Sequence, residues 1–279
     1  MNVLTSARAI LKLLVTSIAL LLLTVDSNLV AQAVDQASAE KYNEGLALLK
    51  EKNYEAALNT FLEAKSMADD AGDTSTASKS ENYAYRLSYN VGVGYVKQED
   101  FEKALELFNQ GISMEPTYYK NYKGRATVYK AQGDPAAAME AYIQTANVAS
   151  EAGELEERSK ALAQAEGFVA KAVQSEDFDQ VIENGNLYLQ FSESPNVHFY
   201  LAHAYNQKGD HQAALTHAND ALTLDQGSRA SKAKIHFEKA EAYKFIGQYQ
   251  DAMESYSQAA YGEFKQRAEH EIEVLSGSE

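Results

Sequence analysis

The chain has no cysteine and no tryptophan, and only three of its 279 residues are proline. Without cysteine there is no disulfide framework and no thiolate nucleophile or metal ligand. The shortage of proline, together with the lack of any run that alternates apolar and polar residues, favours helices over strands. With 45% hydrophobic residues, the chain is neither disordered nor a bundle of membrane helices. The composition therefore predicts an all-α protein.

Basic residues are scarce relative to acidic ones. The sequence has 25 lysines and arginines against 40 aspartates and glutamates, so its formal net charge is −15. Such a surface disfavours phosphate backbones and anionic lipid, and we expect no nucleic acid as a partner. There is also no GxSxG elbow, no HExxH pair and no glycine-rich phosphate loop. We therefore expect no catalysis and no cofactor.

A recurring pair of small residues is the most informative feature that is present. A glycine or alanine is followed twelve positions later by alanine, usually with a bulky residue between them. The two helices of a hairpin approach to about 8–10 Å only where small side chains face each other. One hairpin cannot bury its apolar face alone, so the recurrence predicts a stack of hairpins. The pairs are Gly45 with Ala57, Gly92 with Ala104, Ala126 with Ala138, Ala202 with Ala214, and Ala240 with Ala252.

The residues around these pairs resemble the tetratricopeptide repeat, a helix-turn-helix unit of about 34 residues. The resemblance implies a right-handed α-solenoid of about six hairpins, closed by a C-terminal capping helix at about residues 261–275. With the small residue as position eight, the repeats start at 38, 85, 119, 162, 195 and 233, and one domain covers residues 34–279. The second and third copies show the pattern best, in Tyr89, Gly92, Tyr95, Asp100, Phe101, Ala104, Phe108, Pro116, Tyr122, Ala126, Tyr129, Gly133, Asp134, Ala138 and Tyr142.

The intervals between repeat starts alternate between long and short. Long connectors are therefore expected after the first, third and fifth copies, and the first two are similar in sequence, at residues 67–73 and 148–154. Gly72 and Gly153 in these segments fit helix C-terminal caps, because glycine takes a positive φ without a Cβ clash. The pattern favours a two-repeat unit copied three times, with chance alternation as the alternative.

The fourth copy departs from the pattern. Its small positions hold Val169, Val181 and Tyr188, although Asp177 and the following phenylalanine still mark the turn between its helices. Gly185 falls inside its second helix, where glycine costs about 1 kcal/mol relative to alanine. We therefore expect the stack to bend or loosen at this copy.

The first 33 residues do not fit the repeats. Arg8 and Lys12 precede an uncharged, mostly apolar run from residue 13 to residue 25, and residues 31–33 offer a small-x-small cleavage site. A run of this length is short of the roughly 20 residues that a membrane-spanning helix needs. We expect a signal peptide that is cleaved after Ala33 and a periplasmic or cell-envelope location, with retention of the segment as an N-terminal anchor as the alternative.

Four of the six histidines fall between residues 198 and 217. Two imidazoles share a face of one helix at spacings of three or four. His198 and His203 are five apart and His211 and His217 are six apart, so these spacings predict no metal site. His198 and His236 occupy the same repeat position and are interpreted as packing residues.

In the tetratricopeptide family, the first helix of each repeat lines the concave face through set positions. The resemblance implies a groove for an extended or helical partner segment, held by aromatic rings and by basic groups that attract carboxylates. The alternative is that Tyr42 and Tyr89 pack against the next repeat and that the lysines form a solvated face. The expected groove residues are Tyr42, Asn43, Arg86, Tyr89, Asn90, Lys120, Lys123, Lys130, Phe199, Tyr200, His203, Asn206 and Phe237.

The sequence thus predicts a non-catalytic scaffold of the cell envelope that binds an acidic protein segment in this groove. Two alternatives stay open. One is a ligand-binding or hydrolytic accessory protein of the cell wall, which would need a pocket outside the groove. The other is self-assembly through the C-terminal helix, which otherwise covers the open apolar edge of the last repeat.

Overall fold

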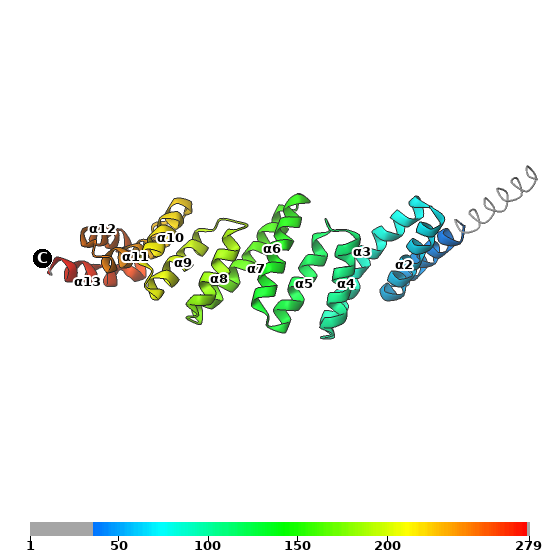
Figure 1. Ribbon diagram of the computed structural model, residues 1–279, viewed down its shortest axis with the longest axis horizontal. Coiled ribbons are helices and arrows are strands. Elements are labelled where there is room, and N and C mark those ends of the chain that lie inside the picture. Colours follow the sequence, from blue (N-terminus) through cyan, green and yellow to red (C-terminus); the bar gives the residue numbers. More distant parts are fainter. Residues whose placement is uncertain (1–35, 278–279) are drawn as a thin grey trace, which may run out of the picture. The chain divides into compact units, whose positions relative to one another are not determined.

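The computed structural model describes residues 36–277, and every regular element among them is helical. These residues form two compact units, with the boundary between Pro116 and Thr117. Figure 1 labels the helices of each unit. The all-α prediction is confirmed, whereas the single domain of residues 34–279 stays a prediction. The predicted signal peptide and its cleavage after Ala33 lie outside the described residues.

The first unit contains two helical hairpins. Its helices are residues 36–50, α2 (Tyr54–Ala71), α3 (Thr74–Lys97) and α4 (Phe101–Met114). Helix α2 packs on α3, and α3 packs on α4. Phe61 is fully buried, and its ring stacks on Tyr83 at 4.7 Å between centroids, which joins the two hairpins through an aromatic contact.

The second unit contains four hairpins and a final helix. Consecutive helices pack on each other throughout, and α9 also contacts both α7 and α11. The first helices of successive hairpins therefore lie side by side, as in an α-solenoid. The bounds are α5 (Tyr119–Gln132), α6 (Pro135–Glu151), α7 (Leu155–Gln174), α8 (Phe178–Leu189), α9 (Pro195–Lys208), α10 (His211–Leu224), α11 (Arg229–Phe245), α12 (Tyr249–Ala259), a 3₁₀ turn (Gly262–Phe264) and α13 (Lys265–Ser276).

The predicted small-residue pairs lie at the helix contacts. Every alanine of the five pairs is fully buried. A Cβ added to Gly45 would stand 2.8 Å from the ring of Phe61, and one added to Gly92 would stand 2.6 Å from the ring of Phe108. The first helix of a hairpin therefore needs a small residue here, because an aromatic ring of the second helix lies against its backbone.

The hairpin turns are fixed by aspartate caps. Asp100, Asp134 and Asp177 each accept a hydrogen bond at the start of the second helix from the backbone N–H three residues further on. Such a cap satisfies one of the N–H groups that the first turn leaves without a partner. These residues stand where the sequence placed the turns, and those predictions are confirmed.

The predicted connectors at residues 67–73 and 148–154 are mostly helical. Helix α2 continues to Ala71 and α6 to Glu151, while α3 and α7 begin well before the predicted repeat starts at 85 and 162. The extra turns bury alanine and serine between the helices, including Ala68, Ala77 and Ser80. Gly72 and Gly153 do have positive φ values, of 77° and 76°, as expected of helix ends.

The C-terminal helix covers the last hairpin. Helix α13 packs on α12, and its buried Ala268 and Leu275 join a cluster around Phe237 and Tyr256. This confirms a final helix close to the predicted residues 261–275, starting at Lys265 after the 3₁₀ turn. In the described part of the chain, we find no helix with the length and apolar character that a membrane span requires.

Candidate partner-binding face

In the second unit, α5, α7, α9 and α11 form one side, which we call the first-helix face. Polar side chains join each of these helices to the next across distances of 2.7–3.0 Å. These contacts fix the sideways spacing of the repeats and use up part of the hydrogen-bonding capacity of the face. They are Lys123 Nζ to Glu157 Oε2, Ser194 Oγ and Asn196 Nδ2 to the Glu166 carboxylate, and Asn206 Nδ2 to Glu238 Oε2.

The three predicted lysines of α5 have different surroundings. Lys123 forms an ion pair with Glu157, whose pKa is lowered by Lys123 and then by Lys160. Lys120 lies 5.9 Å from the ring centre of Tyr118. Lys130 donates to the neutral amide oxygen of Gln164 at 2.8 Å. Much of the charge of Lys123 is thus offset within the chain, whereas that of Lys130 is not.

A hollow of about 550 Å³ lies beside the turn between α5 and α6, against α7. We call it the α5–α7 hollow. Phe168 provides an aromatic wall and packs partly into the core beside Tyr142, with ring centres 6.3 Å apart. The lining residues are Lys130, Gly133, Pro135, Ala163, Gln164, Gly167, Phe168 and Lys171.

The α5–α7 hollow is lined by two lysines and by no carboxylate. Among the described residues, neither Lys130 nor Lys171 forms an ion pair with a carboxylate, and no acidic residue is among those that line the hollow. In a chain with a net charge of −15, two such lysines make a local positive site. Carboxylates are the natural counter-ions.

Small residues on α7 create the space. Ala163 and Gly167 are exposed, and a Cβ added to Gly167 would have no atom within 4 Å. Ala163, Gly167, Phe168 and Lys171 are not among the groove residues predicted from the sequence. The repeat register does indicate two of them. With the fourth repeat starting at residue 162, Ala163 and Gly167 fall at the second and sixth positions, which line the groove in this family.

A second hollow, of about 530 Å³, lies between α9, α11 and the C-terminal helix. It brings together three predicted residues, His203, Asn206 and Phe237. Arg267 of α13 lies over the ring of Phe237 at 4.4 Å. It was missed because it lies outside the repeats. We call this the α9–α11 hollow.

The polar groups of the α9–α11 hollow are paired with one another. His203 Nδ1 lies 3.0 Å from Glu238 Oε1, and Asn206 donates to the same carboxylate. The hydrogen bond to Glu238 raises the pKa of His203, more than desolvation lowers it. Because these groups satisfy each other, the α9–α11 hollow offers a partner fewer open polar sites than the α5–α7 hollow does.

The remaining aromatic residues predicted on α9 are half-buried. Phe199 lies under the ammonium group of Lys234, 4.4 Å from Nζ to the ring centre, and contacts Tyr200. Burial raises the pKa of Tyr200. Both rings therefore contribute to packing between repeats as well as to the surface.

In the first unit, the two predicted tyrosines pack within the chain. The ring centre of Tyr42 lies 5.6 Å from that of Phe61, and that of Tyr89 lies 6.1 Å from that of Phe108. The polar residues predicted beside them are exposed, namely Asn43, Arg86 and Asn90. Both tyrosines thus pack on an aromatic ring of their own hairpin, and their place in a groove stays a prediction.

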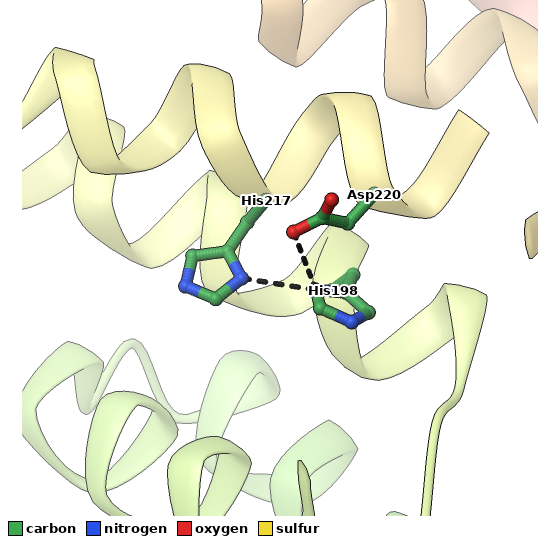
Figure 2. A group of neighbouring side chains, drawn as sticks. All are labelled: His198, His217 and Asp220. Carbon is green, nitrogen blue, oxygen red and sulfur yellow. Dashed lines mark hydrogen bonds and ion pairs between the residues drawn. The ribbon is translucent and has the colours of Figure 1, made fainter. Parts of the chain in front are cut away.

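Two of the histidines lie side by side in space, although the spacing of histidines along the sequence predicts no metal site. His198 on α9 and His217 on α10 face each other across the hairpin, with 3.0 Å between their Nδ1 atoms. Asp220, one turn further along α10, brings its Oδ2 to 3.9 Å from His198 Nδ1 (Figure 2). Because the pair forms between two helices, the spacing of histidines along either helix gives no sign of it.

The tetratricopeptide repeat family model matches residues 85–118, 196–227 and 233–261. These segments begin at, or within one residue of, three of the predicted repeat starts. These three segments are tetratricopeptide repeats. Repeats of this kind present surfaces for protein–protein interaction.

Solved structures with similar folds include YrrB, described as a TPR protein with an unusual peptide-binding site. It is 13% identical, with 66% of this chain and 91% of that chain covered and a TM-score of 0.39. The TPR domain of P58(IPK) is 13% identical over 86% of this chain and 78% of that one, with a TM-score of 0.38. PilF of Pseudomonas aeruginosa is 14% identical over 71% and 99%, with a TM-score of 0.32. No curated protein sequence matches the chain.

Proposed function

We propose that this protein is a non-catalytic scaffold that binds an acidic segment of a partner protein in the α5–α7 hollow. The repeats supply the general role, since stacked hairpins of this family offer extended surfaces to other proteins. The single observation that carries the more specific proposal is the pair Lys130 and Lys171, which line a hollow without any lining carboxylate.

The shape and chemistry of the hollow favour a peptide side chain over a small metabolite. The hollow is open along α7, where Ala163 and Gly167 leave space next to the helix backbone. Phe168 supplies apolar contact and the two lysines supply charge, so a segment with a carboxylate next to an apolar residue fits best. A strongly acidic surface elsewhere would direct such a segment to this one place.

The proposed setting is the cell envelope. The first 33 residues support this. In them, basic residues, an apolar run and a small-x-small site follow one another in the order that is typical of an export signal. Fractionation of cells followed by N-terminal sequencing of the recovered chain tests this. A chain that starts at residue 34 in the periplasmic fraction is expected. A chain that retains its first residues in the cytosolic fraction would contradict export.

Binding can be tested with a defined probe. A fluorescent peptide of alternating glutamate and tyrosine is titrated with the purified chain, and a matched peptide with lysine in place of glutamate is the specificity control. We expect the acidic peptide to bind, and Lys130→Glu with Lys171→Glu to weaken its binding at least tenfold. Added salt should weaken it too, because the contact is electrostatic.

The matched control variant is Lys232→Glu with Lys265→Glu. It changes the net charge by the same amount, and neither lysine lines the two hollows. Equal weakening by both double variants would mean that overall charge, and not the α5–α7 hollow, determines binding. Equal affinity for the acidic and basic peptides would also contradict the proposal.

A further inference from the structure

The histidine pair on α9 and α10 lies apart from the proposed partner site. None of the residues that line the α5–α7 hollow takes part in it. His198 is buried, His217 is half-buried and Asp220 is exposed, so the group runs from the core of the hairpin to its surface. From this geometry we propose that His198, His217 and Asp220 bind a divalent transition-metal ion of the Zn²⁺ class.

The distances between the three side chains suit one small ion. The potential ligand atoms all lie within 4.8 Å of one another. Ligand atoms at about 2.0–2.1 Å from a tetrahedral Zn²⁺ lie about 3.3 Å apart. The two histidine Nδ1 atoms are 3.0 Å apart and Asp220 Oδ2 is 3.9 Å from His198 Nδ1. Small side-chain rotations, mainly of exposed Asp220, are enough to bring all three atoms to bonding distance.

The backbone positions hold the ligands in place. His217 and Asp220 are three residues apart on α10 and therefore share one face of that helix. His198 approaches from α9, which packs against α10 as the other half of the same hairpin. Figure 2 shows the three side chains converging from the two helices. A rigid hairpin thus presents all three ligands, with no loop involved.

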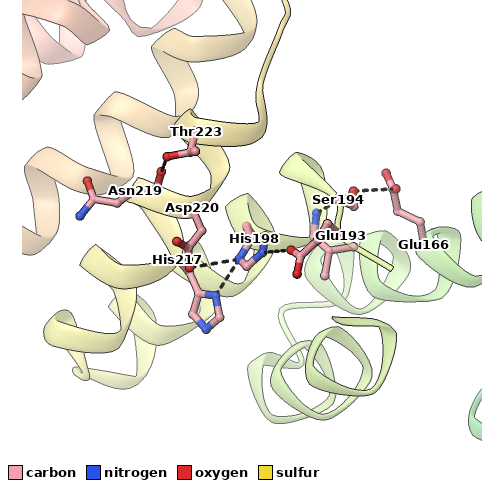
Figure 3. Close-up of polar contacts among 9 residues, drawn as sticks. Glu166, Glu193, Ser194, His198, His217, Asn219, Asp220 and Thr223 are labelled. Carbon is pink, nitrogen blue, oxygen red and sulfur yellow. Dashed lines mark hydrogen bonds and ion pairs between the residues drawn. The ribbon is translucent and has the colours of Figure 1, made fainter. Parts of the chain in front are cut away.

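A fourth side chain orients the buried histidine. Glu193 Oε2 lies 2.8 Å from His198 Nε2, on the opposite edge of the ring from the cluster (Figure 3). Nε2–H donates to this carboxylate, which leaves the lone pair of Nδ1 directed at His217 and Asp220. Carboxylate–histidine–metal arrangements of this kind fix the ring and increase its basicity. The ring of His217 is held in turn by stacking on Tyr205, with 5.4 Å between centroids and 4° between planes.

The donor set selects the class of metal. Two imidazole nitrogens and one carboxylate suit zinc and its late first-row neighbours, whereas Mg²⁺ and Ca²⁺ prefer oxygen ligands alone. With three protein ligands, the fourth position of a tetrahedral ion would be taken by water on the exposed side, next to Asp220. The ion would connect α9 to α10 and stabilise this hairpin against unfolding.

Zn²⁺ titration of the purified chain, prepared without a histidine tag, tests the site by calorimetry. We expect each chain to bind one Zn²⁺ ion, and excess Mg²⁺ should not compete with it. Zn²⁺ should also raise the melting temperature of the protein, and a chelator should reverse this increase. His217→Gln and Asp220→Asn should each weaken binding at least tenfold. They leave the buried His198 in place, so the fold is retained. Glu193→Gln should weaken binding by about 10-fold or more, through His198.

Co²⁺ gives a second readout, because its visible absorption reports tetrahedral nitrogen and oxygen ligands. The spectrum should appear with the unchanged chain and disappear with His217→Gln. His270→Gln, at an exposed histidine of α13, is the matched control and should bind as the unchanged chain does. Absence of saturable Zn²⁺ binding would overturn the site. Equal binding by His217→Gln, Asp220→Asn and His270→Gln would also overturn it, because the ion would then be bound elsewhere.

Discussion

Gly185 of α8 lies directly against Leu201 of α9. A Cβ added to Gly185 would stand 2.7 Å from Cδ2 and 2.8 Å from Cγ of Leu201, which is itself fully buried. The expected bend or loosening at this copy stays a prediction. At Gly185 itself the structure shows a close helix contact that only glycine permits, so its helix-propensity cost is offset by packing between repeats.

Replacing this glycine should therefore destabilise the protein. Gly185→Ala gains about 1 kcal/mol of helix propensity but forces Leu201 to move in a filled core, which typically costs about 1–3 kcal/mol. We expect a net loss of about 1 kcal/mol in the free energy of unfolding, measured by denaturant titration. Gly167→Ala is the matched control and should stabilise by up to about 1 kcal/mol, because its Cβ meets no atom within 4 Å. The reverse order of the two variants would contradict this packing.

The turn caps give a second prediction. Asp134 Oδ1 accepts a hydrogen bond from the N–H of Ala137 at 3.0 Å, whereas Glu154, which precedes α7, makes no such side-chain bond. Asp134→Ala should lower the free energy of unfolding by about 1 kcal/mol, and Glu154→Ala should change it far less. Thermal and denaturant unfolding of both variants measure the difference. A similar effect at both positions would mean that the cap bond adds nothing.

The turns themselves differ in their backbone cost. Gly133, Gly209 and Gly247 take positive φ values before the second helix of their hairpins, but Glu99 and Glu176 take φ of 61° and 55° at the equivalent place. A residue with a Cβ is strained there by about 1–2 kcal/mol. Glu99→Gly should therefore raise the free energy of unfolding by about 0.5–1 kcal/mol, after allowing for the greater freedom of glycine in the unfolded chain. Loss of stability on this substitution would contradict the strain.

The pair His203 and Glu238 predicts a dependence on pH. Glu238, and more weakly Glu176, raise the pKa of His203, while burial and Arg267 lower it, with a net increase. Because the pKa of His203 is raised in the folded state, its protonated form stabilises the fold at pH values below about 6.5, the ordinary pKa of histidine. This stabilisation is lost as the pH rises through the higher pKa of the folded state. His203→Gln should therefore cost more stability at pH 5.5 than at pH 8.5. Unfolding titrations at both pH values test this, and an equal cost would rule out the charged pair.

Much of the fold could be predicted because local sequence determines it. The spacing of Gly92 from Ala104 gives the hairpin contact, and Asp100 and Asp134 mark where second helices begin. Helix length was less predictable. The repeat pattern locates position eight but not the start of the first helix, and residues 74–84 contain no proline or glycine that would delay the start of α3.

The candidate site was harder to predict because its charges depend on contacts between repeats. Lys123 and Glu157 are 34 residues apart and meet on neighbouring first helices. The predicted start of the fourth repeat at 162 left Glu157 in a connector, so this ion pair was not expected. His198 and His217 were missed for a similar reason, because their contact crosses from α9 to α10 and has no signature in the spacing along one helix.

The most direct measurement of the central claim is site-specific photo-crosslinking in cells. A benzophenone amino acid is placed at Ala163, in the α5–α7 hollow, and in a control variant at Thr216, which is exposed on α10. Mass spectrometry then identifies the crosslinked peptides. We predict a defined partner segment rich in aspartate or glutamate from position 163, and its loss when Lys130→Glu and Lys171→Glu are added. The same products from both positions, or a basic segment from position 163, would contradict the account.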